Sequence, residues 1–184
     1  MVTESGQDWL KKLVGIRIFA SKATKAENMD KKTRPTWDEY FMQIAQDVAT
    51  RSTCQSRHVG SVIVVEKRMV ATGYNGSPHG MPHCTDVGCK LVTVTENGES
   101  NEKCDRVLHA EQNAIIQCAM HGVPCKGATI YTTARPCRMC AKMIANAGIK
   151  KVVYCDEPSD KEPFEILKAA GVETQRLAVA AKKK

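Results

Sequence analysis

The sequence predicts an α/β fold, a three-layer α/β/α sandwich built on a mixed five-stranded sheet. Two observations carry this prediction. Residues 59–65 are almost continuously apolar and β-branched, which is typical of a strand buried on both faces. From residue 109 onward, helical patterns alternate with strand patterns, as they do where strands run parallel. A tight turn joins the first two strands, so antiparallel and parallel pairs are expected in the same sheet.

Each element has a local signal. Thr36 and, three residues later, Glu39 form a capping box ahead of apolar residues at helical spacing, so we expect a helix over 37–51. The other elements are recognised by their apolar periodicity and by the turn residues between them. Their predicted ranges are 59–65, 69–73, 128–133, 151–155 and 172–177 for strands, and 109–121, 137–147 and 163–170 for helices.

The stretch between the second strand and the helix at 109 is read as irregular. It opens with a Gly/Pro-rich loop at 73–78 and runs to about residue 106. Loops of that length are uncommon unless they have a function or are tied down. Three cysteines within the stretch suggest the tie.

The chain length allows one well-buried domain and is too short for two ordinary ones. We expect a basic N-terminal extension at 1–34, containing at most one short helix or strand, a folded domain at 35–178 and a basic tail at 179–184. The net charge of +7 arises in these ends, because acidic and basic residues balance between 35 and 181. A basic surface that follows a phosphate backbone, and hence a nucleic-acid partner, is therefore not expected.

Composition points to a soluble globular protein, with 42% hydrophobic and 26% charged residues. No apolar run approaches the roughly 20 residues of a membrane span, and the N-terminus lacks the pattern of a secretory signal. We therefore expect a cytoplasmic protein with no membrane partner. Nine cysteines, an odd number, then favour metal ligation over a disulfide framework.

Two short motifs carry the chemistry. His109-Ala110-Glu111 and Pro136-Cys137-Arg138-Met139-Cys140 each open a predicted helix, where the macrodipole favours negative charge. Cysteines three apart lie on one face of a helical turn and can hold one ion. His109, Cys137 and Cys140 would give zinc three protein ligands, which leaves a fourth position for water, as in catalytic sites. Glu111 is placed to act on that water as a proton shuttle without binding the ion.

Each motif alone is less informative. A single CxxC is also found in redox pairs and in half of a zinc ribbon, but no second CxxC exists in this chain to complete a ribbon. A thioredoxin-like active site would follow the first strand of its fold rather than the third. The joint pattern H-x-E…P-C-x-x-C matches the signature of the zinc nucleobase deaminases.

The chain resembles the deoxycytidylate (dCMP) deaminases of the zinc-dependent cytidine/deoxycytidylate deaminase family, from about residue 35 to about residue 177. The resemblance implies a cytidine deaminase-like fold and hydrolysis of dCMP to dUMP and ammonia, which feeds dTTP synthesis. It also implies a homohexamer activated by dCTP and inhibited by dTTP, with Mg²⁺ accompanying the triphosphate. It rests on RPTWDEYFMQIA, HVGSVIV, TGYNGSP, CDRVLHAEQNAI, YTTARPCRMCAKMI and AGIKKVVYC.

The resemblance also assigns residues. Asn75 is similar to the asparagine that family members direct at the sugar hydroxyl, and Tyr154 to a tyrosine lining the substrate pocket. Tyr74, Asn75 and Gly76 resemble the loop between the catalytic and allosteric sites, and Asn113 a residue near the effector. An asparagine also forms turns, and a tyrosine at a strand end also packs in a core, so the residues alone leave both readings open.

Two further sets of residues are less specific. Arg57, His58 and Arg106 are candidates for the substrate phosphate because they lie near the motifs, although each could equally be a solvated basic residue. In many dCMP deaminases a second, structural zinc lies near Cys54, Cys84, Cys89 and Cys104, with His83 as an alternative ligand; scattered reduced cysteines are the rival reading. Cys118, Cys125 and Cys155 are expected to be small core residues.

Two other functions remain open. A polynucleotide editor would need a basic or aromatic groove, which 5% aromatic residues and a charge-balanced domain do not favour. A non-catalytic module that senses dCTP and dTTP would have no need of Glu111. Gln117 and Met120 are neutral where family members often carry a charge near the effector, so the strength of triphosphate control is left open.

Overall fold

Five strands form one mixed sheet in the order β2-β1-β5-β6-β7 in the computed structural model, which describes residues 34–96, 99–157 and 160–178. β1 pairs antiparallel with both β2 and β5, whereas β5, β6 and β7 run parallel. The predicted mixed five-stranded sheet is thus confirmed. The strands are β1 (Gly60–Val65), β2 (Arg68–Tyr74), β5 (Thr129–Thr132), β6 (Lys151–Tyr154) and β7 (Glu173–Arg176).

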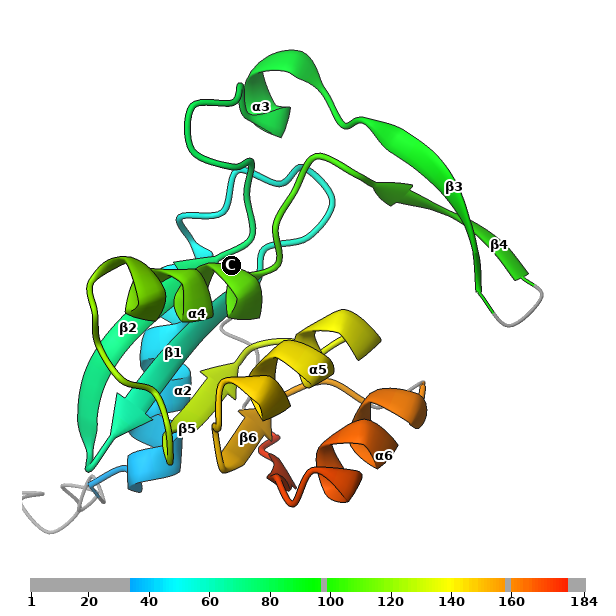
Figure 1. The fold of residues 1–184 in the computed structure, drawn as a ribbon. Coiled ribbons are helices and arrows are strands. Elements are labelled where there is room, and N and C mark those ends of the chain that lie inside the picture. The colour runs from blue at the N-terminus through cyan, green and yellow to red at the C-terminus, as the bar shows by residue number, and fades with distance from the viewer. Residues whose placement is uncertain (1–33, 97–98, 158–159, 179–184) are drawn as a thin grey trace, which may run out of the picture. The chain divides into compact units, whose positions relative to one another are not determined.

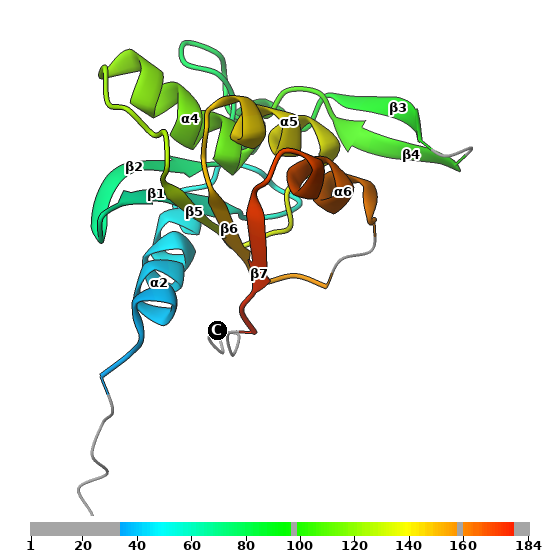
Figure 2. The same cartoon turned by 60° about the horizontal axis from the view of Figure 1, so that its bottom comes forward.

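Helices cover both faces of this sheet (Figures 1 and 2). α2 (Trp37–Ala49) lies on one face, and α4 (Ala110–Met120), α5 (Arg138–Asn146) and α6 (Glu162–Ala169) lie on the other. Side chains of β1 alternate between the two sides, as a strand requires: Ile63 joins the core beneath α4, α5 and α6, and Val62 the core beneath α2. The predicted three-layer sandwich is present.

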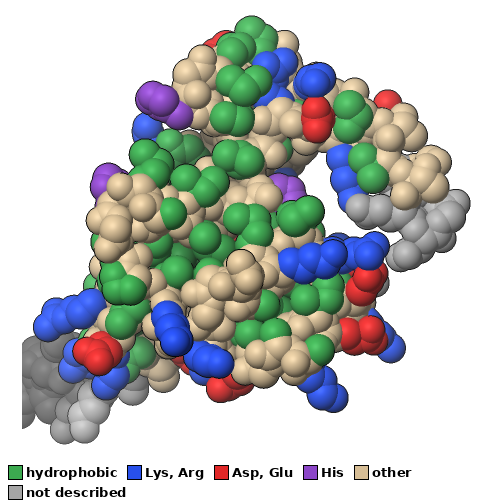
Figure 3. All heavy atoms as spheres, in the orientation of Figure 1, with side chains coloured by type: hydrophobic (Ala, Val, Ile, Leu, Met, Phe, Trp, Pro, Cys, Tyr) green, Lys and Arg blue, Asp and Glu red, His purple; other side chains and the backbone are tan. Residues whose placement is uncertain are grey.

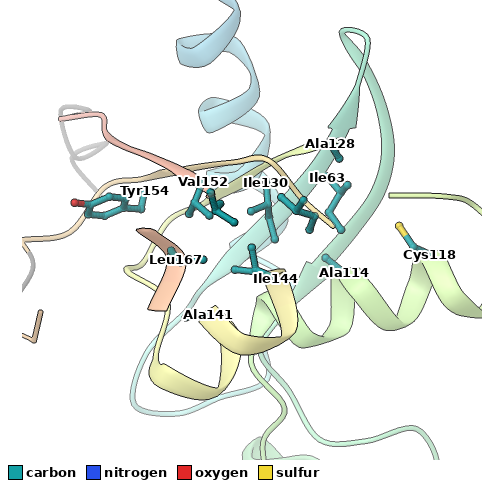
Figure 4. Packing of buried hydrophobic residues seen from close by; sticks show 12 residues of the cluster. Ile63, Ala114, Cys118, Ala128, Ile130, Ala141, Ile144, Val152, Tyr154 and Leu167 are labelled. Carbon is teal, nitrogen blue, oxygen red and sulfur yellow. The ribbon is translucent and has the colours of Figure 1, made fainter. Parts of the chain in front are cut away.

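The larger core lies on the α4–α6 face (Figure 4). Ile63, Ile130 and Val152 from the sheet meet Ala114, Ile144 and Leu167 from the three helices, and all six are fully buried. Burial on this scale is the main favourable contribution to folding. It also fixes α4 and α5 on the same face of the sheet, with both N-termini near the carboxyl end of β5.

α2 is attached to the sheet by its N-terminal turn. The predicted capping box is present, with the Thr36 backbone N donating to Glu39 Oε2 (2.7 Å) and the Glu39 backbone N donating to Thr36 Oγ1 (3.3 Å). In the same turn, Asp38 Oδ1 accepts a hydrogen bond from the Tyr131 hydroxyl of β5 (2.7 Å). This bond pins the start of the helix to the centre of the sheet.

The prediction of an irregular stretch to about residue 106 was wrong. The structure places a short helix, α3 (Cys84–Val87), and an antiparallel hairpin, β3 (Leu91–Glu96) with β4 (Glu99–Cys104), in this stretch. β3 alternates apolar and polar residues, and the dipeptide Asn97-Gly98 is a strong hairpin signal. β4 (ESNEKC) is almost entirely polar, which is why hydrophobic periodicity does not reveal it.

Two predicted segments lie outside the described residues. These are the basic extension at 1–34, except Arg34, with its possible short helix or strand, and the tail at 179–184. Within the part of the chain that the structure describes, no helix is both long and apolar enough to cross a membrane.

Candidate zinc and catalytic site

The candidate metal ligands lie at the N-termini of two helices. His109 is the N-cap residue of α4, and Cys137 is the N-cap residue of α5, one turn ahead of Cys140. Each cap residue has extended backbone angles, so its side chain projects from the start of its helix. Exposed N–H groups and the macrodipole make these positions electropositive, and thiolates are stabilised there.

The three predicted ligands converge. His109 Nδ1 lies 3.4 Å from Cys137 Sγ and 3.4 Å from Cys140 Sγ, and the three atoms lie within 4.8 Å of one another. Bond lengths of 2.0–2.1 Å to nitrogen and 2.3 Å to sulfur around a tetrahedral zinc ion imply ligand separations of about 3.5 Å. The donor set and its spacing therefore fit one zinc ion with three protein ligands.

The thiols are polarised toward ionisation of Cys137. Its Sγ receives hydrogen bonds from Cys140, whose backbone N lies 3.4 Å away, and from His109, and these lower the pKa of Cys137 to about 3. The hydrogen bond with Cys137, together with burial, raises the pKa of Cys140 instead. The hydrogen bond with Cys137 also raises the pKa of His109. The hydrogen bonds within the cluster thus favour the thiolate form of Cys137, which is the form that binds zinc.

Glu111 is the buried carboxyl group of the site. It lies in the first turn of α4 with only 3% of its surface exposed, and burial raises its pKa to about 7. Its own backbone N–H, followed by the charge of His109 and a side-chain interaction with Cys140, opposes this rise in pKa. A carboxyl group with a pKa near neutrality, adjacent to the ligand cluster, can both accept and release a proton.

Asn75 holds a loop together. Its Oδ1 accepts from Ser52 Oγ (2.7 Å) and from the Val59 backbone N (2.8 Å), and its Nδ2 donates to the Arg57 carbonyl (2.8 Å). Both lone pairs of the amide oxygen are therefore used, and one N–H remains for another acceptor. Ser52, buried beside it, also accepts from the Cys54 backbone N (3.2 Å). The sequence gives no signal for this role of Ser52.

The predicted allosteric loop is attached to α4. Gly76 and Leu108, the residue before His109, exchange backbone hydrogen bonds (3.2 and 2.9 Å). Asn113 Nδ2 donates to the Tyr74 carbonyl (2.7 Å). The structure thus brings Tyr74, Gly76 and Asn113 together and connects them to the helix that carries His109.

Tyr154 lies in the core at the end of β6. It is 7% exposed and packs against Phe164 of α6, with ring centroids 4.9 Å apart. A groove of about 580 Å³ between α6 and the sheet edge includes it among its lining residues. These contacts agree with a packing role for Tyr154. The contact of Tyr154 with substrate stays a prediction.

The phosphate candidates differ in their surroundings. Arg57 forms an ion pair with Asp156, and His58 is exposed. Arg106 is half-buried, and among the described residues its buried Nε has no hydrogen-bond partner. A buried guanidinium N–H without an acceptor is costly, so Arg106 is the candidate with unused binding capacity.

A second cysteine cluster closes the loop between β2 and α4. Ligand atoms of Cys84, Cys89 and Cys104 lie within 4.8 Å of one another, with Cys84 Sγ 3.8 Å from Cys104 Sγ. Burial opposes ionisation of Cys104, but backbone N–H groups of Arg106 and Lys90 lower its pKa. Cys54 interacts electrostatically with Cys104 but is not part of this close group. His83 Nδ1 instead lies 3.2 Å from Thr53 Oγ1.

The remaining cysteines lie away from both clusters. Cys118 is buried in the main core, Cys125 packs against that core, and Cys155 packs against the core beneath α2. Burial raises the pKa of Cys118 to about 11, and burial also raises the pKa of Cys155 above its usual range. These positions agree with the prediction of small core residues.

Known proteins resemble this chain in sequence. ComE operon protein 2 of Bacillus subtilis is 44% identical over 148 residues, which cover 78% of this chain and 72% of that protein. The deoxycytidylate deaminase of Saccharomyces cerevisiae is 39% identical over 156 residues, which cover 84% of this chain. The match spans only 49% of the yeast protein, about half its length.

A solved structure resembles the fold. The dCMP deaminase of cyanophage S-TIM5, in complex with dCMP and dUMP, aligns with a TM-score of 0.64 and 33% identity, over 78% of this chain and 98% of that chain. Residues 35–156 match the family described as the cytidine and deoxycytidylate deaminase zinc-binding region. That match includes both helix starts and all three clustered ligands. The chain therefore belongs to the cytidine and deoxycytidylate deaminases, a family of zinc-dependent hydrolytic enzymes.

Proposed function

We propose that the protein deaminates dCMP to dUMP, releasing ammonia. The observation that carries this proposal is the buried Glu111 beside a three-ligand cluster of His109, Cys137 and Cys140. Support for the substrate comes from the relatives that are named deoxycytidylate deaminases and from the cyanophage enzyme that binds dCMP and dUMP.

The chain's own groups divide the work. When bound, zinc supplies Lewis-acid activation of a water molecule at neutral pH. Glu111 accepts a proton from the water and delivers it to the ring nitrogen beside the reacting carbon. The water oxygen bonds to that carbon. Glu111 then takes the second proton from this added oxygen and delivers it to the amine, which leaves as ammonia when its bond to the carbon breaks, so one carboxyl group serves as base and acid in turn. Its burial suits this exchange, because a pKa of about 7 makes both protonation states accessible.

Substrate binding is assigned to the loops around the cluster. Asn75 donates its remaining amide N–H to the sugar hydroxyl, while its other bonds keep the loop in place. Arg106, whose Nε has no hydrogen-bond partner in the described part of the chain, is the preferred phosphate ligand over the ion-paired Arg57. Tyr154 lines the base pocket only through its exposed edge, since most of its ring is buried against Phe164.

A second, structural zinc is part of the proposal. Three thiols of Cys84, Cys89 and Cys104 already lie close together at the base of the β3–β4 hairpin, and Cys54, which interacts electrostatically with Cys104, would supply the fourth. Four thiolates close the coordination of zinc, and such sites contribute folding free energy directly. The metal would anchor this long connection between β2 and α4.

Regulation by dCTP and dTTP, with Mg²⁺ accompanying the triphosphate, is carried by the loop at residues 74–76. Its support is the hydrogen bond that Asn113 of α4 donates to the Tyr74 carbonyl and the pair of backbone hydrogen bonds between Gly76 and Leu108, the residue before His109. A nucleotide that moved this loop would move the catalytic helix with it. The dUMP produced then supports dTTP synthesis, and inhibition by dTTP gives feedback control of the deamination.

Assembly into a homohexamer is the fourth part of the proposal. Hydrophobic side chains gather over α4 on the face shown in Figure 3, and Ile116 and Met120 are 37% and 70% exposed. Met139 at the start of α5 is 58% exposed. Contiguous apolar surface of this kind is typical of interfaces between subunits.

The test is ammonia release from dCMP, dCTP, cytidine and single-stranded DNA, each with and without added dCTP. Turnover of dCMP that rises with dCTP supports the full proposal. Turnover of the DNA alone would make the protein a polynucleotide editor. No release from any substrate, with dCTP and dTTP still bound, would make it a sensor.

A further inference from the structure

Gln112 occupies the third position of α4, directly behind the histidine ligand. Its Oε1 accepts a hydrogen bond of 2.7 Å from the backbone N of His109. That N–H belongs to the N-cap residue and has no partner within the helix, so a side chain at this position is the natural acceptor. The bond fixes the backbone from which the imidazole projects.

The amide nitrogen of Gln112 contacts α5, the helix that supplies the two cysteine ligands. Gln112 Nε2 donates to Met143 Sδ at 3.8 Å, and Met143 lies on α5, one turn beyond Cys140. A thioether is a weak acceptor, so this contact contributes orientation more than energy. One half-buried side chain therefore connects the backbone of His109 with the helix that supplies both thiolates.

We propose that Gln112 is a positioning residue that holds His109 in register with Cys137 and Cys140. The inference rests on the proposed zinc site. Its ligands come from two helices, α4 and α5, and no covalent crosslink joins these helices at the site. Nδ1 of His109 lies 3.4 Å from each sulfur, so a small rotation of the α4 N-terminus would lengthen one contact or both. Groups that orient ligands in this way typically change metal affinity by about 10–100-fold when removed.

The experiment measures the rate of zinc release from the folded holoenzyme to a chromogenic chelator. Gln112→Leu removes both contacts, and we expect release to accelerate about tenfold. Gln112→Glu keeps an oxygen acceptor for the His109 N–H, and we expect a rate within about threefold of the wild type. Met143→Leu removes only the sulfur and should have a smaller effect than Gln112→Leu.

Gln43→Leu is the matched control, because Gln43 lies on α2, on the other face of the sheet, and its amide Nε2 donates to Asp47 Oδ1 (3.4 Å) away from the ligand cluster. It should leave release unchanged. Equal release from Gln112→Leu and the wild type would overturn the inference, as would rapid release from Gln112→Glu. If Gln112→Leu does not fold, the Glu and Met143 variants decide the question. A wild-type protein that binds no zinc at His109 would refute the proposed site itself, whereas slow dCMP turnover with the predicted release rates would refute only the proposed substrate.

Discussion

Gly73 of β2 lies directly against the first turn of α4. A Cβ at Gly73 would come within 2.2 Å of the Ala110 carbonyl oxygen and 2.4 Å of the Ala114 backbone N. Both neighbours are backbone atoms, which cannot rotate away as a side chain can. The absence of a side chain at this position therefore lets the helix carrying His109 and Glu111 rest on the sheet.

Gly73→Ala should displace the start of α4 and reduce dCMP turnover at least tenfold, with a loss of stability of about 1–3 kcal/mol from overpacking. Gly60→Ala is the matched control, because a Cβ at Gly60 would come within 2.1 Å of the Ala45 carbonyl oxygen on the opposite face. It should cost similar stability in a urea titration while affecting turnover less. Equal losses of turnover in the two folded variants would contradict this view of α4.

Glu111→Gln should keep zinc and lose catalysis. The amide has nearly the same shape but cannot accept the proton, so we expect turnover to fall by about 10²–10⁴-fold. Zinc content measured by atomic absorption should equal that of the wild type, because Glu111 is not a ligand in the proposed site. Glu165→Gln, at an exposed position on α6, should change neither quantity. Appreciable activity in folded Glu111→Gln would exclude a proton shuttle at this residue.

The second cysteine cluster predicts two zinc ions per chain. Cys84→Ser should lower the zinc content from two to one and reduce the melting temperature, because the metal anchors the hairpin base. Cys155→Ser, at a cysteine outside both clusters, should retain both ions. One zinc per wild-type chain would show that Cys84, Cys89 and Cys104 are ordinary reduced thiols.

The Tyr131–Asp38 hydrogen bond predicts a purely structural effect. Tyr131→Phe should lower the free energy of unfolding by about 1–2 kcal/mol, because Asp38 Oδ1 loses its hydrogen-bond donor while the ion pair of Asp38 with Lys151 remains, and should leave turnover unchanged. Burial, followed by the bond to Asp38, raises the pKa of Tyr131 above its usual 10. The stability that neutral Tyr131 contributes is therefore fully present below pH 10, and it is lost as the pH rises through the pKa of Tyr131 in the folded protein. Wild-type stability in Tyr131→Phe would show that this hydrogen bond does not help to hold α2 on the sheet.

The sequence predicts a helix or strand correctly where its local pattern agrees with the observed fold. The Thr36–Glu39 capping box, the apolar strand at 59–65 and the two ligand motifs each specify their own element, and all are present with boundaries shifted by one or two residues. β4 (Glu99–Cys104) was not predicted because its residues are polar on both faces. Pairing with β3 across the hairpin, rather than burial, stabilises this strand.

The finer geometry of the site depends on contacts between distant residues. Asn75 is held by Ser52, Val59 and Arg57, and no spacing in the sequence reveals that these groups meet. The position of Cys54 outside the close group of thiols is likewise a matter of loop conformation. Gln112 is an intermediate case, since its place three residues after His109 is visible as half of a capping box but its contact with Met143 is not.

Anomalous diffraction at the zinc edge from crystals of the purified protein tests the central claim most directly. We expect a peak about 2.0–2.1 Å from His109 Nδ1 and about 2.3 Å from the sulfurs of Cys137 and Cys140, with the fourth position open beside Glu111. A peak with four protein ligands there, or no peak between these three residues, would contradict the account.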